Sequence, residues 1–180
     1  MVICSRNVGL CNTIKLKQAQ VEARRMRAVP GTVPGNFMND RKSVAIIGSR
    51  DVDRQTARDL FEQHLSSLLH QGKTWFLGGA RGIDQWAIEW LLEQNEICWA
   101  VVPYTMAKAP KWLWPWLEQV ERVVELQLPR RKSAYSFRNR YIVDLCEIVI
   151  GFRSGKGGGT YSTLRYALRK QKEVHAIPVL

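Results

Sequence analysis

A strand, a glycine-rich loop and the start of a helix follow one another in the stretch Thr74-Trp75-Phe76-Leu77-Gly78-Gly79-Ala80-Arg81-Gly82-Ile83-Asp84. The helix is indicated by Ile83, Ala87, Trp90 and Leu91, which recur at helical spacing. Glycine lets a backbone turn sharply and approach a ligand closely. The N-terminus of a helix adds unpaired N–H groups and a partial positive charge. The stretch therefore indicates either an anion-binding loop or a tight turn with a surface arginine.

Strands and helices alternate on both sides of this stretch. Strands are predicted at 44–47, 74–77, 97–102, 122–126, 148–152 and 174–177, and helices at 57–69, 83–94, 136–146 and 160–171. The run Val44-Ala45-Ile46-Ile47 is wholly apolar, as expected for a strand covered on both faces. The alternation predicts an α/β protein, a Rossmann-like three-layer sandwich with a mostly parallel central sheet.

The chain divides into a flexible basic N-terminal arm, residues 1–42, and a folded domain, residues 43–180. The arm is rich in proline and glycine and carries little strand signal. The whole chain has 27 basic and 16 acidic residues, a net charge of +11. Because the folded part is basic as well, the charge favours a polyanionic partner such as nucleic acid.

Several other classes of protein and site find no support in the sequence. No apolar run approaches the roughly 18 residues of a membrane span, and no secretory-type stretch opens the chain, so we expect a cytoplasmic protein without a membrane partner. The four cysteines match no zinc-binding spacing, and the three histidines are scattered. We predict no metal site and no cofactor.

Four short motifs lie where strands of such a sheet end or where the next helix begins. Their members form the predicted anion-binding rim: Gly48, Ser49, Arg50, Gly78, Gly79, Arg81, Gly82, Asp84, Arg138, Asn139, Arg140, Gly157, Gly158, Gly159 and Thr160. Ligands of doubly wound sheets bind beyond the carboxyl ends of the strands. Backbone N–H groups of the glycines can surround phosphate oxygens, and arginines can grip a phosphate through two hydrogen bonds.

Three features of the sequence each have more than one explanation. Asp84 repels phosphate, so it caps its helix, orients Arg81 or accepts a hydrogen bond from a ribose hydroxyl. Asn139 is either a ligand contact or a hydrogen bonder at a helix end. The aromatic run from Trp112 to Trp116 either stacks on nucleobases or packs a short helix onto the domain or onto a partner subunit.

The sequence favours binding over catalysis. Neither GxGxxG nor GxxxxGK[ST] is present, which argues against a dehydrogenase and a P-loop ATPase. No histidine stands beside a serine or cysteine nucleophile motif, and the loops lack paired acids. We therefore predict no catalytic residue.

The order GSR, then GG-A-RGID, then RNR, then GGT resembles the Rossmann-like core of the DNA-processing protein A family (DprA, or Smf). This family is related to the lysine-decarboxylase-like, cytokinin-activating hydrolases. The resemblance covers residues 43–178. It implies a homodimer that binds single-stranded DNA in a basic pocket and helps to load a RecA-type recombinase during DNA uptake or recombination. It implies no catalysis.

The resemblance has departures and leaves two alternative functions open. Ile88 follows Ala87 at a position where DprA proteins often have histidine. The hydrolases carry a catalytic glutamate in the motif PGGxGTxxE, and alignment on Gly159 and Thr160 puts Thr163 at that position. A nucleoside-monophosphate phosphoribohydrolase is therefore less expected. The other alternative is a sensor that binds a small nucleotide in the same rim.

Overall fold

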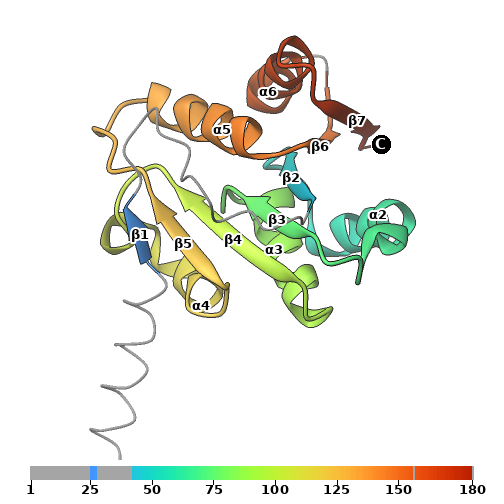
Figure 1. Ribbon diagram of the computed structural model, residues 1–180, viewed down its shortest axis with the longest axis horizontal. Helices are drawn as coiled ribbons and strands as arrows, with labels where there is room; N and C mark the ends of the chain where they lie inside the picture. The colour runs from blue at the N-terminus through green and yellow to red at the C-terminus, as the bar shows by residue number, and fades with distance from the viewer. Residues whose placement is uncertain (1–24, 28–41, 156, 180) are drawn as a thin grey trace, which may run out of the picture.

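The computed structural model describes residues 25–27, 42–155 and 157–179. Its described residues form one sheet of seven parallel strands in the order β1-β5-β4-β3-β2-β6-β7 (Figure 1). The strands are β1 (Arg25–Arg27), β2 (Ser43–Gly48), β3 (Thr74–Leu77), β4 (Ile97–Val102), β5 (Arg122–Glu125), β6 (Ile148–Arg153) and β7 (Glu173–Pro178). The helices are α2 (Arg54–Leu65), α3 (Ile83–Glu93), α4 (Trp114–Leu117), α5 (Ser133–Leu145) and α6 (Gly158–Arg169), with 3₁₀ turns η1 (Ser66–Leu68), η2 (Met106–Lys108) and η3 (Lys111–Leu113).

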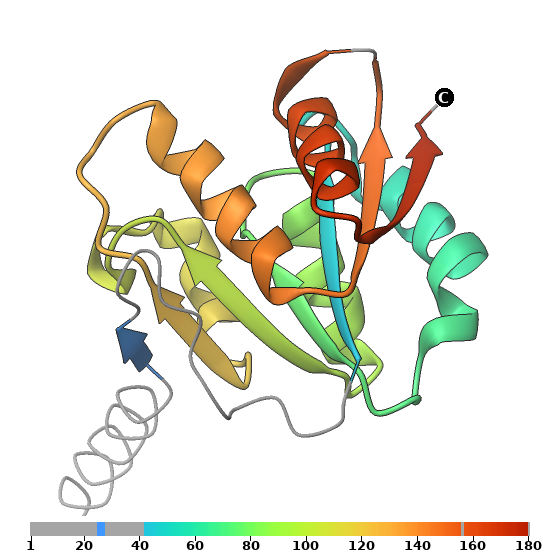
Figure 2. The same ribbon diagram turned by 45° about the horizontal axis from the view of Figure 1, so that its top comes forward.

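Helices cover both faces of the sheet (Figure 2). Successive strand residues point to opposite faces, and β2 shows this directly. Val44 and Ile46 pack with α2, α3 and α4, whereas Ala45 and Ile47 pack with α5 and α6. The apolar run predicted as a doubly covered strand is fully buried. The predicted three-layer α/β sandwich is confirmed.

The strand order determines which loops are neighbours. From β2 the chain moves through β3 and β4 to β5, and then returns to β6 on the other side of β2. All strands run parallel, so every strand-to-helix connection leaves from the same edge of the sheet. The loops after β3, β4 and β5 are therefore neighbours, whereas the loop after β6 lies beyond β2.

Strand β1 lies within the segment predicted as a flexible arm. It pairs with β5, with Arg25 opposite Val123 and Arg27 opposite Glu125. The rest of the predicted arm, apart from Lys42, falls at 1–24 and 28–41, outside the described residues. The domain boundary at residue 43 stays a prediction.

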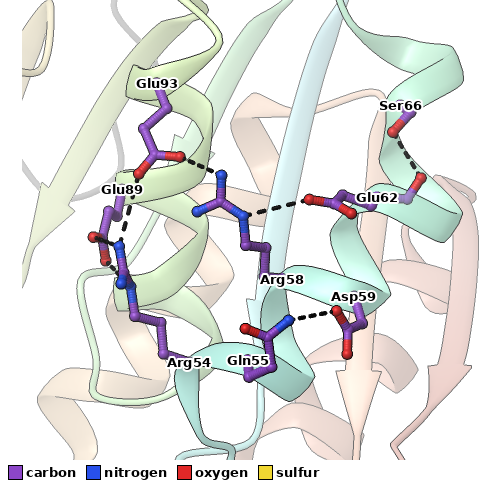
Figure 3. Close-up of polar contacts among 8 residues, drawn as sticks. All are labelled: Arg54, Gln55, Arg58, Asp59, Glu62, Ser66, Glu89 and Glu93. Carbon is purple, nitrogen blue, oxygen red and sulfur yellow. Dashed lines mark hydrogen bonds and ion pairs between the residues drawn. The ribbon is translucent and has the colours of Figure 1, made fainter.

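Ion pairs on the surface join α2 to α3 (Figure 3). The Nη2 atom of Arg54 lies 2.5 Å from Oε1 of Glu89, and Nη2 of Arg58 lies 2.7 Å from Oε2 of Glu93. Exposed pairs of this kind contribute up to about 1 kcal/mol each. They connect the surfaces of the two helices outside the cavity lining. Within the described ranges, no helix is both long and apolar enough to span a membrane.

Candidate nucleic-acid interface

A cavity of about 660 Å³ opens at the carboxyl edge of the sheet, beyond strands β2 to β5. Its lining comes from the loops after β2, β3 and β4, from the connection between β5 and α5, and from α5 itself. The lining residues are Arg50, Gly78, Gly79, Ala80, Arg81, Val102, Pro103, Tyr104, Thr105, Lys108, Ala109, Pro110, Trp112, Leu113, Arg130, Arg131, Lys132, Tyr135 and Arg138. The cavity thus occupies the place where doubly wound sheets bind ligands.

The lining of this cavity is strongly basic. Its charged members are Arg50, Arg81, Lys108, Arg130, Arg131, Lys132 and Arg138. No aspartate or glutamate is among the described residues that line it. A concave surface with charges of one sign focuses the electrostatic field and raises the local concentration of the opposite charge. The cavity therefore attracts anions.

The loop from Gly78 to Gly82 forms one wall of the cavity because its glycines allow close contacts. A Cβ atom at position 78 would lie 1.2 Å from Nη1 of Arg138. Gly82 has a φ of +76°, and a Cβ atom there would lie 2.4 Å from the carbonyl oxygen of Ser49. That carbonyl accepts a hydrogen bond of 3.1 Å from the backbone N–H of Ile83. The loop is thus held between the loop after β2 and the Arg138 side chain.

A buried ion pair lies behind this loop. Nη1 of Arg138 is 3.5 Å from Oδ2 of Asp84, and both residues are almost wholly buried. The Asp84 carboxylate also accepts hydrogen bonds from the backbone N–H groups of Gly48, at 3.2 Å, and Ala80, at 3.4 Å. Burial raises the pKa of the Asp84 carboxyl above its ordinary value, against the opposing influence of Arg138 and the two N–H groups. Asp84 ties the loops after β2 and β3 to α5.

Arg138 has unused hydrogen-bonding capacity. Within the part of the chain that the structure describes, its Nε and Nη1 atoms have no hydrogen-bond partner, although Nη1 faces the Asp84 carboxylate. A buried donor without a partner is costly. Arg138 also lines the cavity. Its guanidinium therefore places a fixed positive charge at the cavity wall.

The three residues of the Arg138-Asn139-Arg140 motif point in different directions. Adjacent residues of an α-helix are about 100° apart around its axis. Asn139 donates a hydrogen bond of 3.0 Å from Nδ2 to Oγ1 of Thr163 on α6. The guanidinium of Arg140 lies 5.4 Å from the ring centre of Tyr166, also on α6. Of this motif, only Arg138 lines the cavity.

The structure divides the predicted rim into three groups. Arg50, Gly78, Gly79, Arg81 and Arg138 line the cavity. Gly48, Ser49, Gly82 and Asp84 support the loops behind it. Asn139, Arg140, Gly157, Gly158, Gly159 and Thr160 lie on or beside α6, outside the cavity lining. Lys156, in the same predicted loop, is outside the described residues.

The loop that precedes α6 is connected to the loop after β2 by a serine pair. Oγ of Ser49 accepts a hydrogen bond of 2.9 Å from the backbone N–H of Ser154 and lies 2.9 Å from its Oγ. Gly157, Gly158 and Gly159 are exposed at the start of α6. The serine pair links the two loops without bringing these glycines to the cavity.

Several lining residues were not predicted as part of the site. Tyr104 and Lys108 follow β4, the basic run Arg130-Arg131-Lys132 follows β5, and Tyr135 begins α5. These segments lack the glycine patterns that indicate phosphate loops. The signal that the sequence does contain is the basic run itself, placed after a predicted strand. In the described part of the chain no cluster of three or more histidine, cysteine, aspartate or glutamate side chains offers a metal site.

Comparison with protein families matches residues 26–180 to the DNA recombination-mediator protein A family. This match covers most of the chain. The chain belongs to the DNA recombination-mediator protein A family. The resemblance inferred from the four motifs is thereby confirmed. A sequence comparison with curated proteins finds no match.

Solved structures of this family have the same fold. DNA processing protein A from Streptococcus pneumoniae is 26% identical, with a TM-score of 0.63 over 77% of this chain and 50% of that chain. Its counterpart from Helicobacter pylori, whose structure addresses its single-stranded DNA binding mode, is 22% identical, with a TM-score of 0.63 over 75% of this chain and 64% of that one. This chain therefore spans between half and two thirds of the length of these family members.

The fold is shared beyond the family. The molybdenum cofactor binding protein from Rippkaea orientalis is 18% identical, with a TM-score of 0.58 over 77% of each chain. At this level of identity the likeness is one of fold. Rossmann-like sheets hold different ligands at the same edge, so the function depends on the residues that line the cavity and not on the fold.

Proposed function

We propose that this member of the DNA recombination-mediator protein A family binds single-stranded DNA in the cavity at the carboxyl edge of its sheet. The observation that carries the proposal is the lining of that cavity, in which seven described residues are basic and none is acidic. Family membership and the single-stranded DNA bound by the Helicobacter pylori relative support the same ligand.

The arrangement of the basic side chains suits a phosphodiester chain. Among the basic residues that line the cavity, Arg50, Arg81 and Lys108 are exposed, whereas Arg138 is buried. Exposed cations contact successive phosphates and release their counterions, which makes binding salt-dependent. The Arg138 guanidinium, held in place beside the Asp84 carboxylate, adds a fixed positive charge for one phosphate to these exposed cations. The cavity has the volume of a small-molecule site, so it contacts a short stretch of strand.

The proposal extends to the cellular role. The protein acts in DNA uptake or recombination, binds single strands as a homodimer, and aids the loading of a RecA-type recombinase. It has no catalytic activity of its own and works in the cytoplasm. These points rest on family membership and on the resemblance described above.

A nucleotide sensor is the second candidate. The volume of the cavity favours it, because about 660 Å³ is typical of a site for a small ligand. A phosphoribohydrolase has less support. Thr163, at the position of the hydrolase glutamate, is buried and donates a hydrogen bond of 2.7 Å to the Gly159 carbonyl.

Fluorescence anisotropy with a labelled single-stranded oligonucleotide tests the proposal. We expect binding at low salt that weakens as salt rises, with a logarithmic slope of about 0.7 for each phosphate contacted. Arg50→Ala and Arg81→Ala should each weaken binding several-fold and reduce that slope. Arg54→Ala is the matched control, because Arg54 is an exposed arginine of α2 that pairs with Glu89 of α3 and is not part of the cavity lining.

A mononucleotide competitor distinguishes the two candidates. Under the DNA proposal, a mononucleotide displaces the oligonucleotide only at a much higher concentration. If the oligonucleotide fails to bind at low salt while a mononucleotide binds tightly, the protein is a nucleotide sensor. Release of free base from a nucleoside monophosphate would instead establish the hydrolase.

A further inference from the structure

Three aromatic rings of the cavity lining each have an arginine guanidinium over them. The guanidinium carbon lies 5.6 Å from the ring centre in the pair Arg81 and Trp112, 5.5 Å in the pair Arg50 and Tyr135, and 6.0 Å in the pair Arg130 and Tyr104. The two tyrosine rings also contact each other edge to face, with centres 6.1 Å apart. Aromatic surface and positive charge are thus interleaved around one cavity.

Trp112 is held on the cavity wall by the residue that follows it. Leu113 is buried and packs so closely on the glycine loop that a Cβ atom at Gly79 would lie 2.8 Å from a Leu113 methyl group. Trp112 itself is half-buried and lines the cavity. The neighbouring Trp114 donates a hydrogen bond of 3.2 Å from Nε1 to the Ala109 carbonyl. Neither Trp114 nor Trp116 is in the cavity lining, so the tryptophan cluster contributes one ring to the site.

A bound nucleotide can displace the guanidinium of Arg81 from the ring of Trp112. Both groups lie at the cavity, and the guanidinium lies over the indole face. A nucleobase prefers the same aromatic face, and a phosphate attracts the guanidinium. One nucleotide therefore offers each member of the pair a new partner at once.

Resting on the proposed function, we propose that Trp112 is a stacking platform for a base of the bound strand. The base occupies the indole face, Arg81 turns to the adjacent phosphate, and the fixed positive charge of Arg138 attracts a phosphate. Tyr104 and Tyr135 line the same cavity. Binding then depends on bases as well as on phosphates, with no requirement for a particular base, because every base has a stacking face.

The contributions of the bases and of the phosphates to binding can be measured separately with two oligonucleotides of equal length. One carries thymine at every position, and the other keeps the sugar–phosphate chain but lacks all bases. The unmodified protein should bind the thymine strand at least about fivefold more tightly, as expected for one stacked base. Equal affinity for the two strands would overturn the inference.

Variants of Trp112 test whether this ring causes the preference for the thymine strand over the base-free strand. Trp112→Leu keeps an apolar side chain and removes the aromatic face, so it should bind both strands with nearly the affinity of the unmodified protein for the base-free strand. Trp112→Phe should keep most of the preference. Trp116→Leu is the matched control, because Trp116 is a half-buried tryptophan of the same segment outside the cavity lining. Thermal unfolding of each variant verifies that it is folded.

The outcomes separate this inference from the proposed function. If the unmodified protein prefers the thymine strand and Trp112→Leu keeps that preference, the base stacks elsewhere and the inference is wrong, while DNA binding stands. If the unmodified protein binds neither strand at low salt, the proposed function itself fails. Loss of the preference in Trp116→Leu, but not in Trp112→Leu, also contradicts the role of Trp112.

Discussion

At the scale of single residues, the buried contact between Arg138 and Asp84 connects the cavity lining to the interior of the domain. It joins a cation of the lining to the carboxylate that holds the loops after β2 and β3. Removing one partner of such a pair leaves the other charge unpaired in the interior, which typically lowers the free energy of unfolding by about 3–5 kcal/mol. The pair therefore couples the stability of the domain to the position of an arginine at the binding site.

The absence of a side chain at position 78 makes this contact possible. In Gly78→Ala the new methyl group would fall 1.2 Å from Nη1 of Arg138 and 2.6 Å from Oδ2 of Asp84. We expect the guanidinium to be displaced, the free energy of unfolding to fall by about 1–3 kcal/mol, and oligonucleotide binding to weaken. Urea denaturation and anisotropy measure the two effects.

Gly155→Ala is the control for this prediction, because no atom lies within 4 Å of a Cβ at position 155. It should unfold and bind as the unmodified protein does. A Gly78→Ala variant that matched it in both measurements would show that Arg138 does not need its observed position.

At the scale of helices and strands, the sequence predicted the elements well and the site only in part. The runs that became β2 to β6 were readable because a strand buried on both faces is apolar at nearly every position, whereas β7 is a largely exposed edge strand. The predicted rim combined loops after β2, β3 and β6 as equivalent neighbours. The sheet order places β6 on the other side of β2 from β3, and that order depends on packing between distant segments. The glycines before α6 were therefore predicted beside a cavity that they do not line.

The Arg138-Asn139-Arg140 motif shows the same limit within one helix. A motif read along the sequence looks like one unit, yet the helix sends its three side chains to Asp84, Thr163 and Tyr166. Arg138 could be distinguished from its two neighbours only by knowing which side of α5 faces the cavity. Tyr104 and Lys108, in turn, had no local signal, since nothing in their sequence distinguishes a cavity wall from an ordinary surface loop.

The start of α2 gives a prediction on pH. Asp53 caps this helix, with Oδ1 accepting from the Thr56 N–H at 3.0 Å and Oδ2 accepting from the Thr56 hydroxyl at 2.7 Å. These hydrogen bonds lower the pKa of the Asp53 carboxyl below its ordinary value. The carboxylate's contribution to stability is therefore complete above the ordinary pKa of the unfolded chain. It is lost as the pH falls through the lower pKa of the folded state.

Asp53→Asn isolates this contribution, because asparagine is also a good N-cap but does not titrate. We expect the variant to have nearly the melting temperature of the unmodified protein at pH 7 and a shallower decline of that temperature between pH 5 and pH 3. Melting curves at several pH values provide the measurement. Identical acid profiles would mean that Asp53 is not a source of the acid sensitivity.

At the scale of the whole molecule, the short strand β1 bears on where the folded domain begins. It extends the sheet beyond β5, whose outer edge would otherwise be unpaired. We predict that a chain starting at residue 24 is more stable than one starting at residue 43, by about 1–3 kcal/mol, since backbone hydrogen bonds to β5 are lost with β1. Urea denaturation of the two chains tests this. Equal stability would support the boundary at residue 43 that the sequence predicts.

The cavity draws its lining from positions that range from Arg50 to Arg138, brought together only when the strands have assembled. In the unfolded chain no such assembly of charges exists. A strand that binds only the folded protein therefore stabilises it. At a free strand concentration of a hundred times the dissociation constant, binding adds about 2.7 kcal/mol to the free energy of unfolding. Without an anion, the crowded cations repel one another. The protein is then at its most resistant to unfolding and proteolysis while it is occupied.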